Sequence, residues 1–202
     1  MSGWGRALGT SARVWVPVAA AVTAAQVLLV VGDPMPAASP GFVAAALASG
    51  AVFAIGLWLV SRALTLAIAG EPVRWRAVLT AHPALVWAIV VVVLLVLLGL
   101  LSPYLTVVGL WFGLLVMPAA SAGASNPLPA AGHTIRRQPT RAILAAVVVA
   151  VVWALGALGM LLLGFFVTGP LSAALTWIAL TVLGTVVLAV WTDLYARARV
   201  TR

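Results

Sequence analysis

Six long runs of apolar residues constrain this chain more than any other feature of its sequence, because each is about long enough to cross a bilayer. They cover residues 14–31, 41–60, 78–101, 104–120, 142–167 and 171–191, with short connections between them. Hydrocarbon offers no hydrogen bonds to a polypeptide backbone, so a chain that crosses it forms helices or a closed barrel. We therefore predict an all-α fold: a polytopic membrane bundle of about six transmembrane helices in a single domain, residues 1–202.

The first apolar run has an alternative interpretation as a signal peptide. Arg6 and Arg13 would supply its positive segment, and Ala37-Ala38-Ser39 would supply its cleavage site. However, the run is longer than the apolar segment of a usual signal peptide, and a second long run follows after a short connection. A hairpin of two transmembrane helices is the simpler interpretation.

Composition excludes several classes of function. Hydrophobic residues make up 65% of the chain and charged residues 7%, with a mean hydropathy of +1.24, which is far from a soluble globular protein. The chain has no Cys, so disulfides, thiol catalysis and cysteine-ligated metals are excluded. Its net charge of +8 would suggest nucleic acid in a soluble protein, but in a membrane protein it indicates anionic lipid. We expect no nucleic-acid partner.

The arginines fall into four groups, and six membrane crossings place all four groups on one side of the membrane. The groups are Arg6 and Arg13; Arg62, Arg74 and Arg76; Arg136, Arg137 and Arg141; and Arg197, Arg199 and Arg202. The three opposite connections contain only Asp33 as an ionisable residue. Because cytoplasmic connections carry the excess of positive charge, we expect both termini in the cytoplasm of a multi-pass cell-membrane protein.

Each pair of runs closes with a short connection rich in Pro or Gly, which predicts three helical hairpins. A basic segment precedes each hairpin, so the hairpins are either a parallel repeat, as in some small transporters, or a product of charge and apolar composition. We favour the second explanation. Two more polar segments lie on the arginine side, and we predict an interfacial stretch at 63–77 and a loop at 121–141.

The chain ends in the pattern Trp191-Thr192-Asp193-Leu194-Tyr195-Ala196-Arg197-Ala198-Arg199. Three hairpins with basic lead-ins, ending in Asp-Leu and spaced arginines, resemble the six-span membrane domain found fused to some glycerophosphoryl diester phosphodiesterases. The architectural likeness covers the whole chain, whereas the motif covers only its end and has two extra residues between Leu194 and the first Arg. No hydrolase domain is attached, so the phosphodiesterase activity cannot be carried over, and the resemblance implies an accessory membrane module of unassigned chemistry.

The interior of the runs carries no charged residue, although such residues usually mark ion or proton pathways. Gln26 is the polar side chain that needs a partner in hydrocarbon, and we expect it to bond to a neighbouring helix rather than to a substrate. The Thr and Ser hydroxyls can bond to their own helix. The spacing of Gly109 and Gly113 predicts close helix packing, within the chain rather than in a dimer.

His82 and Glu71 are the candidates for acid–base chemistry at the level of the lipid headgroups. A phospholipid enzyme would need such a group beside arginines that bind the phosphate. A histidine bonded to backbone or water at the membrane interface is the simpler interpretation of His82. The sequence contains no HExxH motif, phosphate-binding loop, paired carboxylates or Ser/His/Asp set. We therefore assign no catalytic residue, no metal and no cofactor.

Three classes of function remain. The first is a non-catalytic membrane scaffold or accessory subunit that binds other membrane proteins, a second copy of itself or anionic lipids. The second is a small transporter or lipid translocator, and the third is a headgroup-acting enzyme. Basic side chains near an anionic surface attract lipid headgroups, unless they serve only to orient the protein. The candidates for headgroup binding are Arg62, Arg74, Arg76, Arg136, Arg137, Arg141, Arg197 and Arg199.

Overall fold

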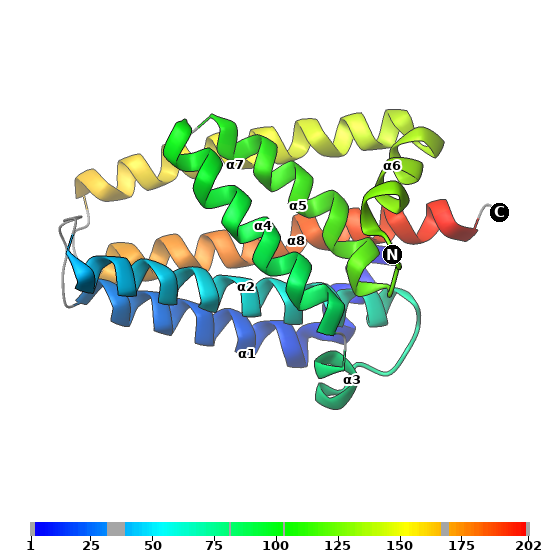
Figure 1. Ribbon diagram of the computed structural model, residues 1–202, viewed down its shortest axis with the longest axis horizontal. Coiled ribbons are helices and arrows are strands. Elements are labelled where there is room, and N and C mark those ends of the chain that lie inside the picture. The colour runs from blue at the N-terminus through cyan, green and yellow to red at the C-terminus, as the bar shows by residue number, and fades with distance from the viewer. Residues whose placement is uncertain (1–2, 32–38, 81, 103, 167–169, 201–202) are drawn as a thin grey trace.

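The computed structural model describes residues 3–31, 39–80, 82–102, 104–166 and 170–200, and every element within these ranges is a helix. Figure 1 shows four long helices, α1, α2, α7 and α8, running roughly along one axis, while α4 and α5 cross them obliquely; the start of α1 and the end of α8 lie at the same end of the bundle. The long helices are α1 (Gly3–Val31), α2 (Pro40–Ile68), α4 (His82–Leu101), α5 (Leu105–Ser121), α7 (Pro139–Phe166) and α8 (Pro170–Val200). The short helices are α3 (Trp75–Leu79) and α6 (Pro127–Arg137).

Five of the described helices are long and apolar enough to cross a membrane. They are α1, α2, α4, α7 and α8. Helix α5 is also apolar but has 17 residues, which is the lower limit of a membrane-spanning helix. The prediction of an all-α, multi-pass membrane protein is confirmed, whereas the sixth crossing stays a prediction.

A glycine with a left-handed backbone lies two residues after the end of α2 and two residues after the end of α5. Gly70 has φ 76° and Gly123 has φ 75°, a conformation that costs glycine little. The chain turns back so that the backbone N–H of Glu71 donates to Leu66 O, and that of Ala124 to Ala119 O. These bonds satisfy the last carbonyls of each helix. Helix α2 was predicted to end at residue 60. It continues to Ile68, and the left-handed turn that follows it is at Gly70.

Residues 127–137 form helix α6, so the prediction of a loop over 121–141 is wrong for this part of the segment. The Asn126 side chain caps the helix by accepting from Leu128 N at 3.2 Å, and a proline follows as the first residue, where its missing N–H costs nothing. Ala131 and Thr134 face inward while Arg136 is exposed. This spacing of buried residues outweighed the polar composition on which the loop prediction rested.

The tightly packed part of the bundle lies in the half that carries the arginines. Helix α1 packs against α2 and α8, α4 packs against α5, and α7 packs mainly on α8. Fully buried side chains in this half include Val14, Leu64, Met117 and Trp191. Toward the opposite end the same helices expose large apolar side chains to their surroundings. Examples are Leu28, Leu47, Leu100, Leu101, Leu171 and Ile178.

Two glycines let helix backbones approach closely in the packed half. A Cβ added at Gly113 of α5 would lie 2.6 Å from Val91 Cγ1 of α4, and one added at Gly56 of α2 would lie 2.8 Å from Val22 Cγ2 of α1. Van der Waals contact drives helix association in hydrocarbon, so these positions contribute directly to the fold. Gly109 likewise faces α4, where a Cβ would lie 3.0 Å from Leu95 Cδ2. The glycine pair of α5 therefore packs within the chain.

We predict that Gly113→Ala destabilises the bundle by about 1–3 kcal/mol, because the added methyl overpacks the contact with Val91. The matched control is Gly184→Ala in α8, where an added Cβ meets nothing within 4 Å. Unfolding by denaturant in detergent micelles would measure both variants. Combining Gly113→Ala with Val91→Ala should cost less than the sum of the two single changes. Strict additivity would contradict the packing assigned to this pair.

Candidate functional site

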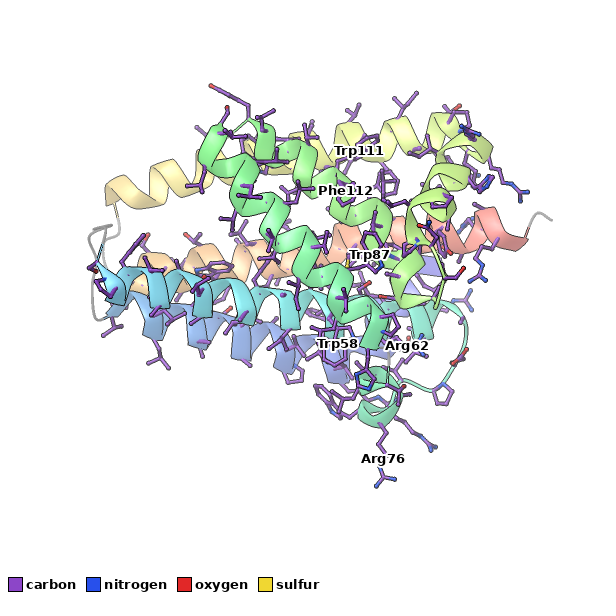
Figure 2. All side chains as sticks on the ribbon, in the orientation of Figure 1. Trp58, Arg62, Arg76, Trp87, Trp111 and Phe112 are labelled. Atoms are coloured by element: carbon purple, nitrogen blue, oxygen red, sulfur yellow. The ribbon has the colours of Figure 1, made fainter. Side chains whose placement is uncertain are left out.

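The described arginines gather at one end of the bundle and come from three parts of the chain. Figure 1 places α3, α6, the start of α1 and the end of α8 at this end. One group belongs to α2 and the segment before and within α3, a second group belongs to α6, α7 and α8, and Arg6 and Arg13 belong to α1. In Figure 2, Arg76 projects away from the helices, whereas Arg62 lies against them. All described arginines except Arg62 are exposed.

Arg62 ties three helices together. Its Nη1 donates to Ser121 O at 2.7 Å, and its Nε donates to Ala77 O at 3.4 Å. Ser121 is the last residue of α5, so the guanidinium meets the negative end of that helix dipole and one of its unpaired carbonyls. Arg62 was predicted as a headgroup contact, and the structure assigns two of its donors to the fold.

A buried pair of serines lies next to this tie. Ser61 Oγ and Ser121 Oγ lie 2.7 Å apart in hydrogen-bond contact, and Ser61 Oγ also lies 3.3 Å from Met117 O as a donor. Both serines are essentially inaccessible to solvent, so each hydroxyl depends on the other helix for a partner. Sequence reasoning missed this pair, and the only signal was a serine close to the end of each of two apolar runs.

The second group of arginines holds α6 against the end of α8. Arg137 Nη1 donates to Ala198 O at 3.0 Å, which joins the two helices. Arg197 forms a salt bridge with Asp193 at 2.8 Å on the same face of α8, and the Arg199 guanidinium carbon lies 5.7 Å from the Tyr195 ring centroid. These contacts give the guanidinium groups a fixed arrangement.

Other arginines extend from the surface without such ties. Arg74, Arg76 and Arg136 are exposed, and no hydrogen bond joins them to another described side chain. Arg141 is also exposed and reaches Gln138 Oε1 at 3.4 Å. The arginines predicted as one set therefore divide into those that bond to another part of the chain and those that are exposed without such a bond.

His82 and Glu71 do not meet in the structure. His82 is the exposed first residue of α4, and Glu71 is exposed in the connection after α2. No hydrogen bond links the two within the described residues, and no group of three or more His, Cys, Asp or Glu side chains gathers there in a way that could hold a metal ion. The acid–base role of His82 and Glu71 stays a prediction.

Gln26 bonds to a neighbouring helix through both ends of its amide. Its Nε2 donates to Ser49 O at 3.1 Å, and its Oε1 accepts from Ser49 Oγ at 2.7 Å. Gln26 is buried in α1, and Ser49 lies in α2, so the pair joins the first two helices. This arrangement satisfies the polar groups that hydrocarbon would leave unpaired.

A cavity of about 430 Å³ lies between the six long helices, on the far side of the buried core from the arginines. Its wall is almost entirely apolar. Three threonines line it, Thr106, Thr181 and Thr185, and the hydroxyls of the last two donate to carbonyls of their own helix, Trp177 O and Thr181 O, each at 2.7 Å. A hollow of about 350 Å³ adjoins it and shares Phe53 and Trp177 with its wall.

Two buried indole N–H groups lie near the arginine-side end of the cavity. Trp191 and Trp111 pack in a cluster with Val149, Val187 and Leu114, and these three residues also line the cavity. Neither indole nitrogen has a hydrogen-bond partner among the described residues. A buried donor without an acceptor costs about 1–3 kcal/mol. The cluster is thus closely packed yet incompletely satisfied in its hydrogen bonds.

No protein-family model, no curated protein and no solved structure matches this chain. The functional candidates therefore rest on the geometry of the chain itself. The resemblance to the phosphodiesterase-linked membrane domain stays a prediction.

We predict that Arg62→Ala destabilises the bundle by about 2 kcal/mol, because it removes charge-assisted bonds and leaves the end of α5 unpaired. Arg76→Ala is the matched control, since Arg76 is exposed and should change stability by less than about 0.5 kcal/mol. Unfolding in detergent micelles, followed by circular dichroism, would compare them. Equal stability of the two variants would show that the Arg62 contacts contribute nothing to the fold.

Proposed function

We propose that this protein is a non-catalytic membrane scaffold or accessory subunit that holds its arginine-rich end against anionic lipid headgroups. The observation that carries the proposal is the set of exposed arginines at one end of the bundle. Acidic neighbours are few there: among the described residues, Glu71 is exposed and Asp193 already pairs with Arg197. The positive charge is left for an external partner.

The energetics favour a lipid surface as that partner. Each basic side chain near an anionic leaflet contributes about 1 kcal/mol. Arg74, Arg76 and Arg136 together would thus contribute about 3 kcal/mol, and their forked guanidinium groups suit phosphate oxygens. Two other arginines, Arg62 and Arg137, bond to carbonyls near helix ends. These bonds help to hold the helices that present the exposed arginines.

We further propose six crossings with both ends in the cytoplasm of the cell membrane. Helix α5 would extend about 25 Å at ~1.5 Å per residue, and a bilayer core of ~30 Å can thin locally to match it. With α5 as a crossing, α3, α6 and both ends of the chain fall on one side, which the excess of arginine assigns to the cytoplasm.

The alternative functions receive less support from the geometry. A translocator of polar headgroups would need polar groups along its path, but the cavity wall is apolar and two of its hydroxyls are bonded to their own helix. A headgroup enzyme would need His82 and Glu71 to converge, and both side chains are exposed without a bond between them. An accessory role also agrees with the membrane domain that the chain resembles.

Single cysteines can test the topology, because the chain has no Cys of its own. We expect Tyr104→Cys, whose parent side chain is 79% exposed between α4 and α5, to react with an impermeant thiol reagent on intact cells. Glu71→Cys and His133→Cys should react only after the membrane is opened. Reaction of His133→Cys on intact cells would contradict six crossings with cytoplasmic ends.

The lipid contact can be tested by changing Arg74, Arg76 and Arg136 to Lys, which keeps charge and orientation but removes the forked donors. We expect the cardiolipin or phosphatidylinositol retained in native mass spectrometry to fall about tenfold, equivalent to ~1.4 kcal/mol. Arg197→Lys is the control, since Arg197 is already paired with Asp193. Unchanged retention in the triple variant, or no retained anionic lipid in the parent, would mean that these arginines only set the topology.

A further inference from the structure

The cavity between the six long helices lies where their packing loosens. On the arginine side it ends at buried residues such as Trp191, which is 2% exposed. Beyond it, toward the opposite end of the bundle, the helices expose their apolar side chains. All six helices contribute to its wall, including Val22 of α1, Val60 of α2 and Trp153 of α7. The cavity is therefore a feature of the whole bundle rather than a gap between two helices.

The adjoining hollow lies between this cavity and the outer surface of the bundle. Phe53, Leu95 and Trp177 line both spaces. The wall of the hollow also includes Ala46 of α2 and Val96 of α4, which are exposed on the outside. The hollow thus opens to the surroundings between α2 and α4, and Phe53, Leu95 and Trp177 lie between it and the cavity. The rings of Phe53 and Trp177 have centroids 6.2 Å apart.

The chemistry of the wall selects an apolar occupant. A polar solute would lose its hydrogen bonds to water and find few replacements, because the wall has three hydroxyls and two of them, Thr181 and Thr185, already donate to carbonyls of their own helix. Water gains little in such a space, since apolar cavities of this kind stay dry and accept apolar molecules. Membrane hydrocarbon is the apolar material that surrounds the exposed faces of α2 and α4.

The dimensions match one hydrocarbon chain. A volume of about 430 Å³ lies within the usual range for a ligand pocket, which is ~300–1,000 Å³. Along α8 the wall extends from Trp177 to Leu188, which corresponds to about 16 Å at ~1.5 Å per residue. One leaflet of a bilayer provides about 15 Å of hydrocarbon. A helix of a second protein, about 10 Å across with its side chains, would not fit without separating the bundle.

Two glycines in the wall leave space that the chain itself does not fill. A Cβ added at Gly156 of α7 or at Gly184 of α8 would meet nothing within 4 Å. Gly56 and Gly113 also line the cavity, but they lie at close helix contacts where an added Cβ would clash. Gly156 and Gly184 therefore border open space and contribute no comparable contact to the fold.

We propose that the cavity binds one hydrocarbon chain of a membrane lipid, which enters between α2 and α4 past Phe53 and Trp177. The headgroup stays outside the bundle, at the membrane interface, and the hydrocarbon chain alone enters through the hollow. The site is distinct from the exposed arginines and does not depend on their binding to anionic headgroups. Burial of each methylene group in the cavity adds to affinity through close contact with the wall.

A photoreactive lipid can test the site. The full chain would be reconstituted in phosphatidylcholine vesicles containing a phosphatidylcholine with a diazirine in the middle of one acyl chain. After irradiation, peptide mapping by mass spectrometry would locate the attachment sites. We expect labels on cavity residues such as Trp153 and Leu188 in addition to residues on the outer faces. Labels confined to outward-facing residues such as Leu28 and Leu100 would overturn the proposal.

Two variants fill the cavity, and one matched variant does not. Gly184→Leu and Gly156→Leu place a side chain in the open space, whereas Gly159→Leu makes the same change on α7 at a position that also meets nothing within 4 Å but does not line the cavity. We expect either filling variant to lower cavity labelling about tenfold, since a leucine takes the place of several methylene groups of the chain and removes their contacts with the wall. Gly159→Leu should leave cavity labelling unchanged.

The pair of filling variants keeps the test decisive if one of them fails to fold, because the two substitutions lie on different helices. Equal cavity labelling in the parent, Gly156→Leu and Gly184→Leu would overturn the proposal. Crosslinks between two protein chains at cavity residues, together with a doubled mass that the filling variants abolish, would assign the cavity to a second copy and also overturn it.

Discussion

Association of the helices depends on close contact rather than on the hydrophobic effect, because lipid tails are as apolar as the side chains that they would replace. The closest contacts form where glycines meet branched side chains, as at Gly113 with Val91 and at Gly56 with Val22. A few polar bonds add to these contacts, including the Ser61–Ser121 pair. Such bonds have little competition from water in the bundle interior, so each one selects a particular neighbour among helices of similar composition.

The same reasoning explains why the two halves of the bundle differ. In the arginine half, Arg62 and Arg137 reach carbonyls near the ends of α5 and α8, and the helices there enclose a packed core. Farther along, between the described helices, the ties between side chains are fewer and include Gln26 with Ser49. The helices diverge, and the cavity occupies the region where close contact gives way to exposed apolar faces. The positions of these side-chain bonds thus account for a closely packed basic end and for an apolar cavity farther along the bundle.

Helix positions were largely predictable, since runs of apolar residues and the glycines and prolines between them are local features. Helix α6 was missed because a cap at Asn126 and buried positions such as Ala131 form a helix that polar composition conceals. For the candidate site, the need of Gln26 for a partner could be predicted, but its partner could not. Likewise, no local feature distinguishes Arg62, which ties three helices, from the exposed Arg76.

The sequence by itself determined that this chain forms apolar helices. It also determined that six crossings would place all the arginines on one side of the membrane. Hydropathy and backbone hydrogen bonding within a helix depend on neighbouring residues, so both can be read along the chain. Only the tertiary structure decided which arginines remain free and where the bundle is hollow. These properties arise between residues distant in sequence, such as Arg62 and Ser121 or Phe53 and Trp177, whose proximity depends on how the helices pack.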